Sequence, residues 1–173
     1  RVAVVERARN FNFAGRLEEL VNRTNQLNFT KSRMAVGTME EYVSSVSENL
    51  TYSLFAWDKY GYYGLVGFAG VSNRGDNLEH FLFSCRTMNM GVERALAAYI
   101  KEKLPNKNLK FPVSSELPDW ITIVSSSSDE FQEKLAKDES FSGAANPSLR
   151  IMANCQSGPI APVSYTHLRA HET

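Results

Sequence analysis

The sequence has few cysteines, no excess of charge and no long hydrophobic run, and each of these absences excludes a class of protein. Two cysteines in 173 residues cannot form the disulfide framework of a small secreted domain, which fits a reducing cytoplasm. Nineteen basic residues balance nineteen acidic ones, so charge gives no argument for binding nucleic acid or an anionic membrane. The apolar run at 64–71 has the length of a strand and is too short to span a bilayer. We therefore expect a cytoplasmic protein with no nucleic-acid or membrane partner.

Both ends of the chain look like interruptions of a longer protein. The chain starts with Arg1 instead of methionine and shows no signal peptide, and residues 163–173 resemble a translated sequencing adapter. Excluding that end removes His167 and His171 and leaves His80 as the remaining histidine. We expect no metal site and no histidine-based triad.

Hydrophobic periodicity predicts one α/β domain over residues 1–137. Strands are predicted at 2–7, 51–57, 62–71, 78–83, 109–113 and 120–125, and helices at 13–26, 38–46, 92–103 and 129–137. Turn-rich segments between the second, third and fourth strands favour an antiparallel meander. Helix caps are predicted at Asn12, at Thr38 in a capping box with Glu41, and in the serine run 125–128.

The composition changes after residue 137. Residues 138–148 are small and polar and indicate a linker, and 149–162 look like the start of a truncated downstream domain. The turn at 154–158 resembles one found at the front of some SGNH-like transferases.

The most informative segment is the polar turn at 84–93, which follows an aromatic strand and opens a helix. The first amides of a helix lack intrahelical acceptors and its dipole adds positive charge, so such a turn can bind an anion. The spacing Arg86-x-x-Asn89-x-Gly91 resembles the turn with which GNAT-fold acyltransferases hold the pyrophosphate of CoA or phosphopantetheine. Asn89 stands where that family has its first glycine, and asparagine tolerates left-handed backbone. Candidate cofactor-binding residues are Arg86, Asn89, Met90 and Gly91; the alternative is an ordinary helix start with a solvated arginine.

The order of the predicted elements is also that of the GNAT fold, with a mixed central sheet and helices on both faces. The turn falls between the fourth strand and the third helix, where that fold binds its cofactor. The glycines at 64 and 67 interrupt the third strand and predict a bulge or a close backbone approach.

Three blocks, at 22–30, 58–67 and 81–93, resemble the C-terminal GNAT-like half of FkbH-like proteins of the HAD-IIIC family. The resemblance implies an upstream HAD-like domain that takes a phosphorylated glyceryl donor, 1,3-bisphosphoglycerate. It also implies transfer of a glyceryl or related acyl group to the phosphopantetheine arm of an acyl carrier protein in polyketide-type biosynthesis. The upstream domain is not in this sequence, and the aromatic pattern that closes many GNAT domains is not found after Lys103. Two alternatives stay open, a non-catalytic carrier-protein docking module and a free-standing N-acetyltransferase that uses acetyl-CoA.

Three residues are candidates for catalysis. Cys85 precedes a helix, whose N-terminus favours thiolate, although strand alternation from Phe81 and Phe83 predicts a buried, inert cysteine. Asp58 and Glu79 are the acids nearest the expected groove, and either is a candidate general base. His80, beside Glu79, is expected on the strand surface.

Four residues near the end of the first helix are candidates for substrate binding. Asn25, Gln26 and Asn28 offer amides that suit a glyceryl hydroxyl or the carrier-protein arm, or that simply cap the helix and form a turn. Arg23 is a candidate to pair with a phosphate or with Asp58. The alternative is that it forms an ordinary surface ion pair.

Overall fold

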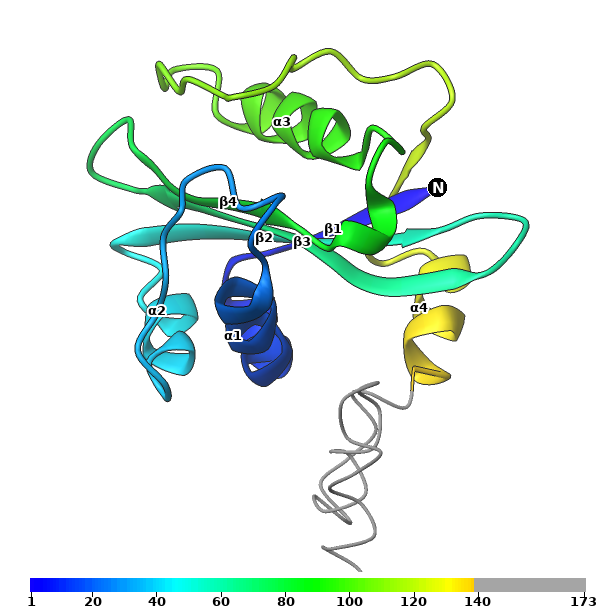
Figure 1. Ribbon diagram of the computed structural model, residues 1–173, viewed down its shortest axis with the longest axis horizontal. Helices are drawn as coiled ribbons and strands as arrows, with labels where there is room; N and C mark the ends of the chain where they lie inside the picture. Colours follow the sequence, from blue (N-terminus) through cyan, green and yellow to red (C-terminus); the bar gives the residue numbers. More distant parts are fainter. Residues whose placement is uncertain (139–173) are drawn as a thin grey trace, which may run out of the picture. The chain divides into compact units, whose positions relative to one another are not determined.

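A computed structural model describes residues 1–138, which form a mixed α/β fold (Figure 1). Arg1–Lys134 make one compact unit, and a second unit starts at Leu135. Apart from residue 138, the predicted linker, the downstream domain start and the adapter-like end lie outside the described residues.

The elements follow the predicted order with shifted bounds. The strands are β1 (Val2–Glu6), β2 (Asn49–Trp57), β3 (Tyr62–Ser72), β4 (Leu78–Phe83) and β5 (Ile123–Val124). The helices are α1 (Ala14–Arg23), α2 (Met39–Ser44), α3 (Val92–Lys103) and α4 (Asp129–Ala136), with short 3-10 helices η1 (Arg7–Phe13) and η2 (Cys85–Thr87).

The five strands form one sheet in the order β4-β3-β2-β1-β5. Strands β1 to β4 pair antiparallel with their neighbours, which confirms the predicted meander, and β5 pairs parallel with β1. The prediction of a strand at 109–113 is wrong. These residues form a loop whose apolar side chains pack against the core. Pro112 interrupts this segment and has no N–H to donate to a sheet.

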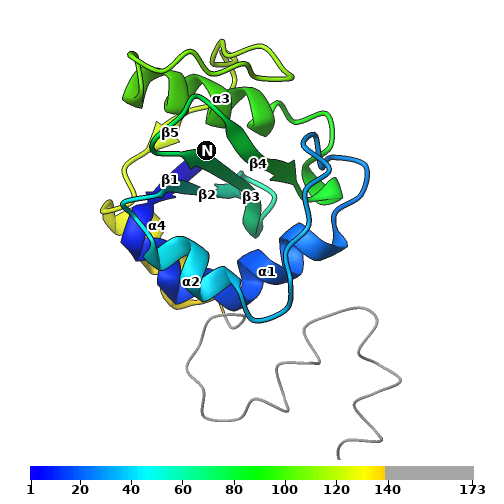
Figure 2. The ribbon, with the colours of Figure 1, turned by 90° about the vertical axis from the view of Figure 1, so that its left-hand side faces the viewer.

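The helices cover both faces of the sheet, as predicted: α1 and α2 lie on one face and α3 on the other (Figure 2). Strand β2 divides its side chains accordingly, because neighbouring strand residues point to opposite faces. Tyr52 and Leu54 join the core cluster of α3. Phe55 and Trp57 instead contact Phe131 of α4, with ring centroids 5.2 Å and 5.9 Å apart.

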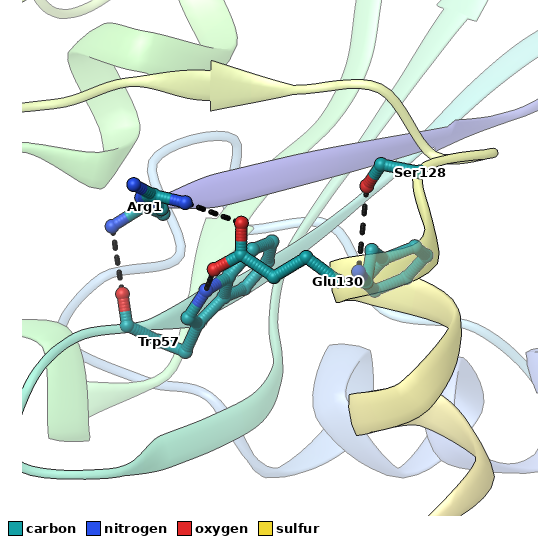
Figure 3. A network of polar contacts seen from close by, with 5 residues as sticks. Arg1, Trp57, Ser128 and Glu130 are labelled. Carbon is teal, nitrogen blue, oxygen red and sulfur yellow. Dashed lines mark hydrogen bonds and ion pairs between the residues drawn. The ribbon is translucent and has the colours of Figure 1, made fainter.

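A polar network ties α4 to the end of β2 (Figure 3). The indole Nε1 of Trp57 donates to Glu130 at 2.8 Å, and the guanidinium of Arg1 pairs with the same carboxylate. Ser128 accepts a hydrogen bond from the amide of Phe131 at 3.3 Å, which confirms the predicted serine cap of this helix.

Of the other two predicted caps, the one at Asn12 is wrong and the one at Thr38 is confirmed in position only. Helix α1 follows η1 directly, so Phe13 is its N-cap residue and Asn12 lies inside the preceding 3-10 turn. Thr38 is the N-cap residue of α2, but its hydroxyl donates to the carbonyl of Ala35 at 2.6 Å and accepts no hydrogen bond from a helix amide.

Strand β3 is irregular at the two glycines singled out in the sequence. Leu54 pairs with Gly67 and Phe55 with Leu65, so Val66 is an extra residue in a β-bulge. A second irregularity lies near Gly64, which has a φ of +75°. At Gly67 the ring of Phe83 packs against the bare backbone, and an added Cβ would lie 2.6 Å from it. Both predicted functions of these glycines, bulge and close approach, are confirmed.

Gly67→Ala should therefore lower the free energy of unfolding by about 1–3 kcal/mol, because Phe83 cannot move without disturbing the core. The matched control is Gly15→Ala in α1, where nothing lies within 4 Å of the added Cβ. That control should raise stability by about 0.5–1 kcal/mol, since alanine favours helix over glycine. Urea denaturation measures both, and a Gly67→Ala protein as stable as wild type would contradict this packing.

Candidate functional site

The outer edge of β4 is covered by residues 27–32 of the α1–α2 connection, here called the edge segment. Leu27 accepts from the amide of Phe83 at 3.0 Å, and Phe29 donates to the carbonyl of Phe81 at 3.0 Å. The Ser32 hydroxyl donates to the carbonyl of Glu79 at 2.7 Å. A sheet edge exposes unpaired amides and carbonyls, and these contacts satisfy them along most of β4.

The edge segment brings two of the sequence blocks together in space. Asn28 forms an antiparallel bridge with Leu82, with Leu27 and Phe29 bonded on either side of it. The ladder ends there, because β4 stops at Phe83, the chain enters η2 at Cys85, and Gln26 lies in a turn. The block at 22–30 therefore meets the block at 81–93 at the end of β4, just before the turn at 84–93 begins.

The turn itself is held by short-range hydrogen bonds. Thr87 is fully buried, and its hydroxyl donates to the carbonyl of Ser84 at 2.9 Å. The Ser84 hydroxyl accepts from the amide and the Nε of Arg86, at 3.4 Å and 3.3 Å. The guanidinium of Arg86 is thus oriented by Ser84 and open to solvent.

Two residues of the turn have left-handed backbone. Asn89 has a φ of +66°, in line with asparagine taking the place of a glycine, and Gly91 has a φ of +78°. Gly91 is the N-cap residue of α3, and a Cβ added there would lie 3.2 Å from Pro118 and 3.3 Å from Trp120. Only glycine combines this backbone with the close packing of the 118–120 loop.

Trp120 is a residue of this site that sequence reasoning missed. Its indole Nε1 donates to the carbonyl of Met90 at 3.0 Å, while 69% of the residue stays exposed. The sequence prediction placed it in a strand at 120–125, whereas the strand is limited to Ile123–Val124. A large aromatic residue in a proline-containing loop was the available signal.

Cys85 is exposed, so the predicted burial beside Phe81 and Phe83 is wrong. The alternation fails because β4 ends at Phe83 and the chain then enters η2, which turns the side chains out of register. The sulfur therefore lies at the surface next to Arg86.

Asp58 is occupied by the β2–β3 turn. Its Oδ1 accepts from the amides of Tyr60 and Gly61, at 2.7 Å and 3.1 Å, and its Oδ2 accepts from the Tyr63 hydroxyl at 2.9 Å. Desolvation opposes ionisation, but these hydrogen bonds outweigh it and hold the pKa of Asp58 below its usual value. A carboxylate stabilised in this way is a weak proton acceptor at neutral pH.

Glu79 lies near the opposite end of β4 from Cys85. Gly70 pairs with His80 and Val71 with Leu78, so Glu79 is the extra residue of a bulge. Its carboxylate accepts from the Tyr42 hydroxyl at 2.6 Å, and desolvation together with this contact raises the pKa of Tyr42 strongly. Four strand residues, on the order of 13 Å, separate Glu79 from the end of the strand.

His80 is buried, at 6% exposed, so its predicted surface position is wrong. The bulge turns its ring toward α2. The ring of Tyr42 from α2 lies edge-on to it, with centroids 5.3 Å apart, and the ring of Phe68 from β3 has its centroid 5.9 Å away. Burial lowers the pKa of His80, and the nearby charge of Glu79 opposes this only in part.

The candidate substrate-binding residues fall into two groups. Arg23 pairs with Glu19 at 2.7 Å, which is the surface ion pair among its alternatives. Asn28 is buried, donates to the carbonyl of Ser32 at 2.9 Å and accepts from Thr30 at 3.3 Å, so it shapes the turn. Gln26 is exposed, and Asn25 accepts from Arg33 at 2.5 Å. Asn25 and Gln26 directly precede Leu27, which bonds to the end of β4. Asp58 is instead bonded within the β2–β3 turn, and Glu79 is bonded to Tyr42.

Within residues 1–138, no cluster of three or more histidine, cysteine, aspartate or glutamate residues is arranged to hold a metal ion. No helix in this part of the chain is long and apolar enough to cross a membrane. No family model, curated protein or solved structure matches the chain.

The pKa of His80 gives a pH prediction. The folded-state pKa lies below the unfolded value of 6.5, so the unfolded chain binds the proton first. The contribution of neutral His80 to stability is therefore complete above pH 6.5 and lost as the pH falls below it. His80→Phe keeps an aromatic ring against Tyr42 and Phe68 without this titration.

Free energies of unfolding in urea at about pH 7.5 and about pH 5.5 test this prediction. Wild type should lose more stability between these two pH values than His80→Phe. Equal losses in both proteins would show that His80 is not held neutral by the fold.

Proposed function

We propose that this chain is the GNAT-like, pantetheine-binding part of an FkbH-like protein that loads a glyceryl or related acyl group onto a cytoplasmic acyl carrier protein. The observation that carries the proposal is the meeting of two family-like blocks at the end of β4. Leu27 bonds to Phe83 and Asn28 bridges to Leu82, although more than fifty residues separate the partners in the sequence. The five-stranded mixed sheet, with helices on both faces, supports this fold assignment.

The donors at the turn fit a phosphate of CoA or of the phosphopantetheine arm. Arg86 offers an exposed guanidinium in the turn that leads into α3, a twelve-residue helix whose leading amides have no intrahelical acceptors. Glu93 also lies in that first turn, where its carboxylate already uses part of the helix dipole. Arg86 therefore supplies most of the attraction for an anion.

The surroundings of the candidate bases favour binding over independent catalysis. Asp58 is hydrogen-bonded into its turn and Glu79 into the contact with Tyr42, so neither is positioned to take a proton at Cys85. This favours a division of labour in which the upstream HAD-like domain handles the phosphorylated donor and this domain presents the thiol of the arm. A domain that only docks the carrier protein is the second candidate, and a free-standing N-acetyltransferase is the third.

Ligand binding at the turn can be followed through Trp120, because the other tryptophan, Trp57, is buried. Titration with CoA should change the fluorescence of the wild-type chain. Arg86→Ala should weaken CoA binding about tenfold, roughly 1.4 kcal/mol, through loss of a charge-assisted hydrogen bond. Arg74→Ala is the control, since Arg74 is an exposed arginine of the β3–β4 turn. Equal affinities in all three proteins would contradict a phosphate site at Arg86.

A loading assay separates the three candidate functions. The domain, alone and fused to its native upstream domain, is incubated with holo carrier protein and 1,3-bisphosphoglycerate, and loading is followed by intact mass. Loading by the fusion but not by the domain alone supports the proposed division of labour. Equal loading by a fusion with Arg86→Ala and Asn89→Ala would overturn the pantetheine site. Efficient acetylation of an amine from acetyl-CoA would favour the third candidate.

A further inference from the structure

The α1–α2 connection is closed by an arginine that sequence reasoning passed over. The Nη1 of Arg33 donates to the carbonyls of Val21 and Thr24, at 2.7 Å and 2.6 Å. Its Nη2 donates to Oδ1 of Asn25 at 2.5 Å. The first two acceptors are carbonyls at the end of α1, which a helix cannot satisfy by itself. One guanidinium thus caps the helix and fixes the side chain of Asn25.

The same connection is fixed a second time on β4, through Leu27 and Phe29 of the edge segment. Residues 25 and 26 therefore lie between two fastened points, Arg33 on one side and the β4 edge on the other. The Nζ of Lys31 adds a contact to the Asn25 carbonyl at 3.1 Å. This double attachment fixes the backbone of residues 25 and 26 relative to the end of β4.

We propose that Arg33 is a positioning residue that fixes Asn25 and Gln26 where the chain enters the edge segment, and that these two amides help to bind a ligand held at the 84–93 turn. Gln26 offers both a donor and an acceptor, and Asn25, whose Oδ1 accepts from Arg33, still offers its NH2 donors; both suit the peptide-like amides of a pantetheine arm. The part of this inference that concerns the ligand rests on the proposed function. The part that concerns the edge segment does not.

The geometry requires arginine and not merely a positive charge. Arg33 reaches three acceptors from two different nitrogens of one planar group, whereas a lysine presents a single ammonium. Arg74 offers a matched control. Its side chain is 81% exposed, and its ion pair with Glu48 is loose, with 3.8 Å between the guanidinium nitrogen and the carboxylate oxygen.

Amide hydrogen exchange measured by NMR on the full chain tests the structural part. The Phe83 amide bonds to the edge segment, whereas the Leu82 amide points to β3 on the other side of the strand. Arg33→Lys should speed exchange at Phe83 about tenfold and leave Leu82 unchanged, which also shows that the sheet remains folded. Arg74→Lys should change neither. Unchanged exchange at Phe83 in Arg33→Lys would overturn the inference.

Steady-state loading of holo carrier protein by the fusion to the upstream domain tests the positioning part. Arg33→Lys should raise KM for the carrier protein about tenfold and change kcat less than about twofold, because binding of the arm is lost while the chemistry lies elsewhere. Asn25→Ala should raise KM similarly but leave exchange at Phe83 at the wild-type rate. A fall in kcat at constant KM would contradict positioning of the arm.

Failure of the proposed function can be told apart from failure of the inference about Arg33. If the wild-type chain binds neither CoA nor the carrier arm, the proposed function is wrong, and exchange at Phe83 still decides whether Arg33 fastens the edge segment. If wild type binds and Arg33→Lys binds equally well, the proposed function stands and Arg33 has no positioning role.

Discussion

The hydrogen bonds between the edge segment, residues 27–32, and the free edge of β4 are the constraint on which the rest of this structure depends. They satisfy an edge that would otherwise expose its amides and carbonyls. They also occupy the position where another strand would pair, and β5 joins the sheet at its opposite edge, beside β1. The same contacts carry the end of α1 to the end of β4. The hydrogen bonds of the edge segment thus both close this edge of the sheet and place the end of α1 near the candidate site.

The site that results is better equipped to hold a ligand than to transform one. Its polar groups are the exposed guanidinium of Arg86 and the first amides of α3, which suit the binding of an anion. The side chains with acid–base potential, Asp58 and Glu79, are engaged in a turn and in a bulge. Trp120 contributes by holding the backbone at Met90 and packing on Gly91.

Local signals in the sequence predicted the regular elements well. The helix at 92–103 and the strand at 78–83 have the predicted bounds, because their periodicity is strong and their flanking residues are turn formers. The left-handed backbone at Asn89 and the bulges near the strand glycines follow from local chemistry as well. Features set by distant contacts were not predictable from the sequence. They include the hydrogen bonds of Arg33 to the end of α1, the packing of Trp120 against Gly91 and the burial of His80. Cys85 was misplaced because strand alternation was extended past the strand end.

The central claim is that residues 25–26 and 84–92 form one ligand site. Backbone NMR of the isotopically labelled chain during titration with holo carrier protein tests it most directly. The amides of Gln26, Arg86 and Val92 should shift with a single dissociation constant, while those of Asp58 and Glu79 stay in place. Shifts confined to one of the two blocks, or the absence of any shift at both, would contradict the account.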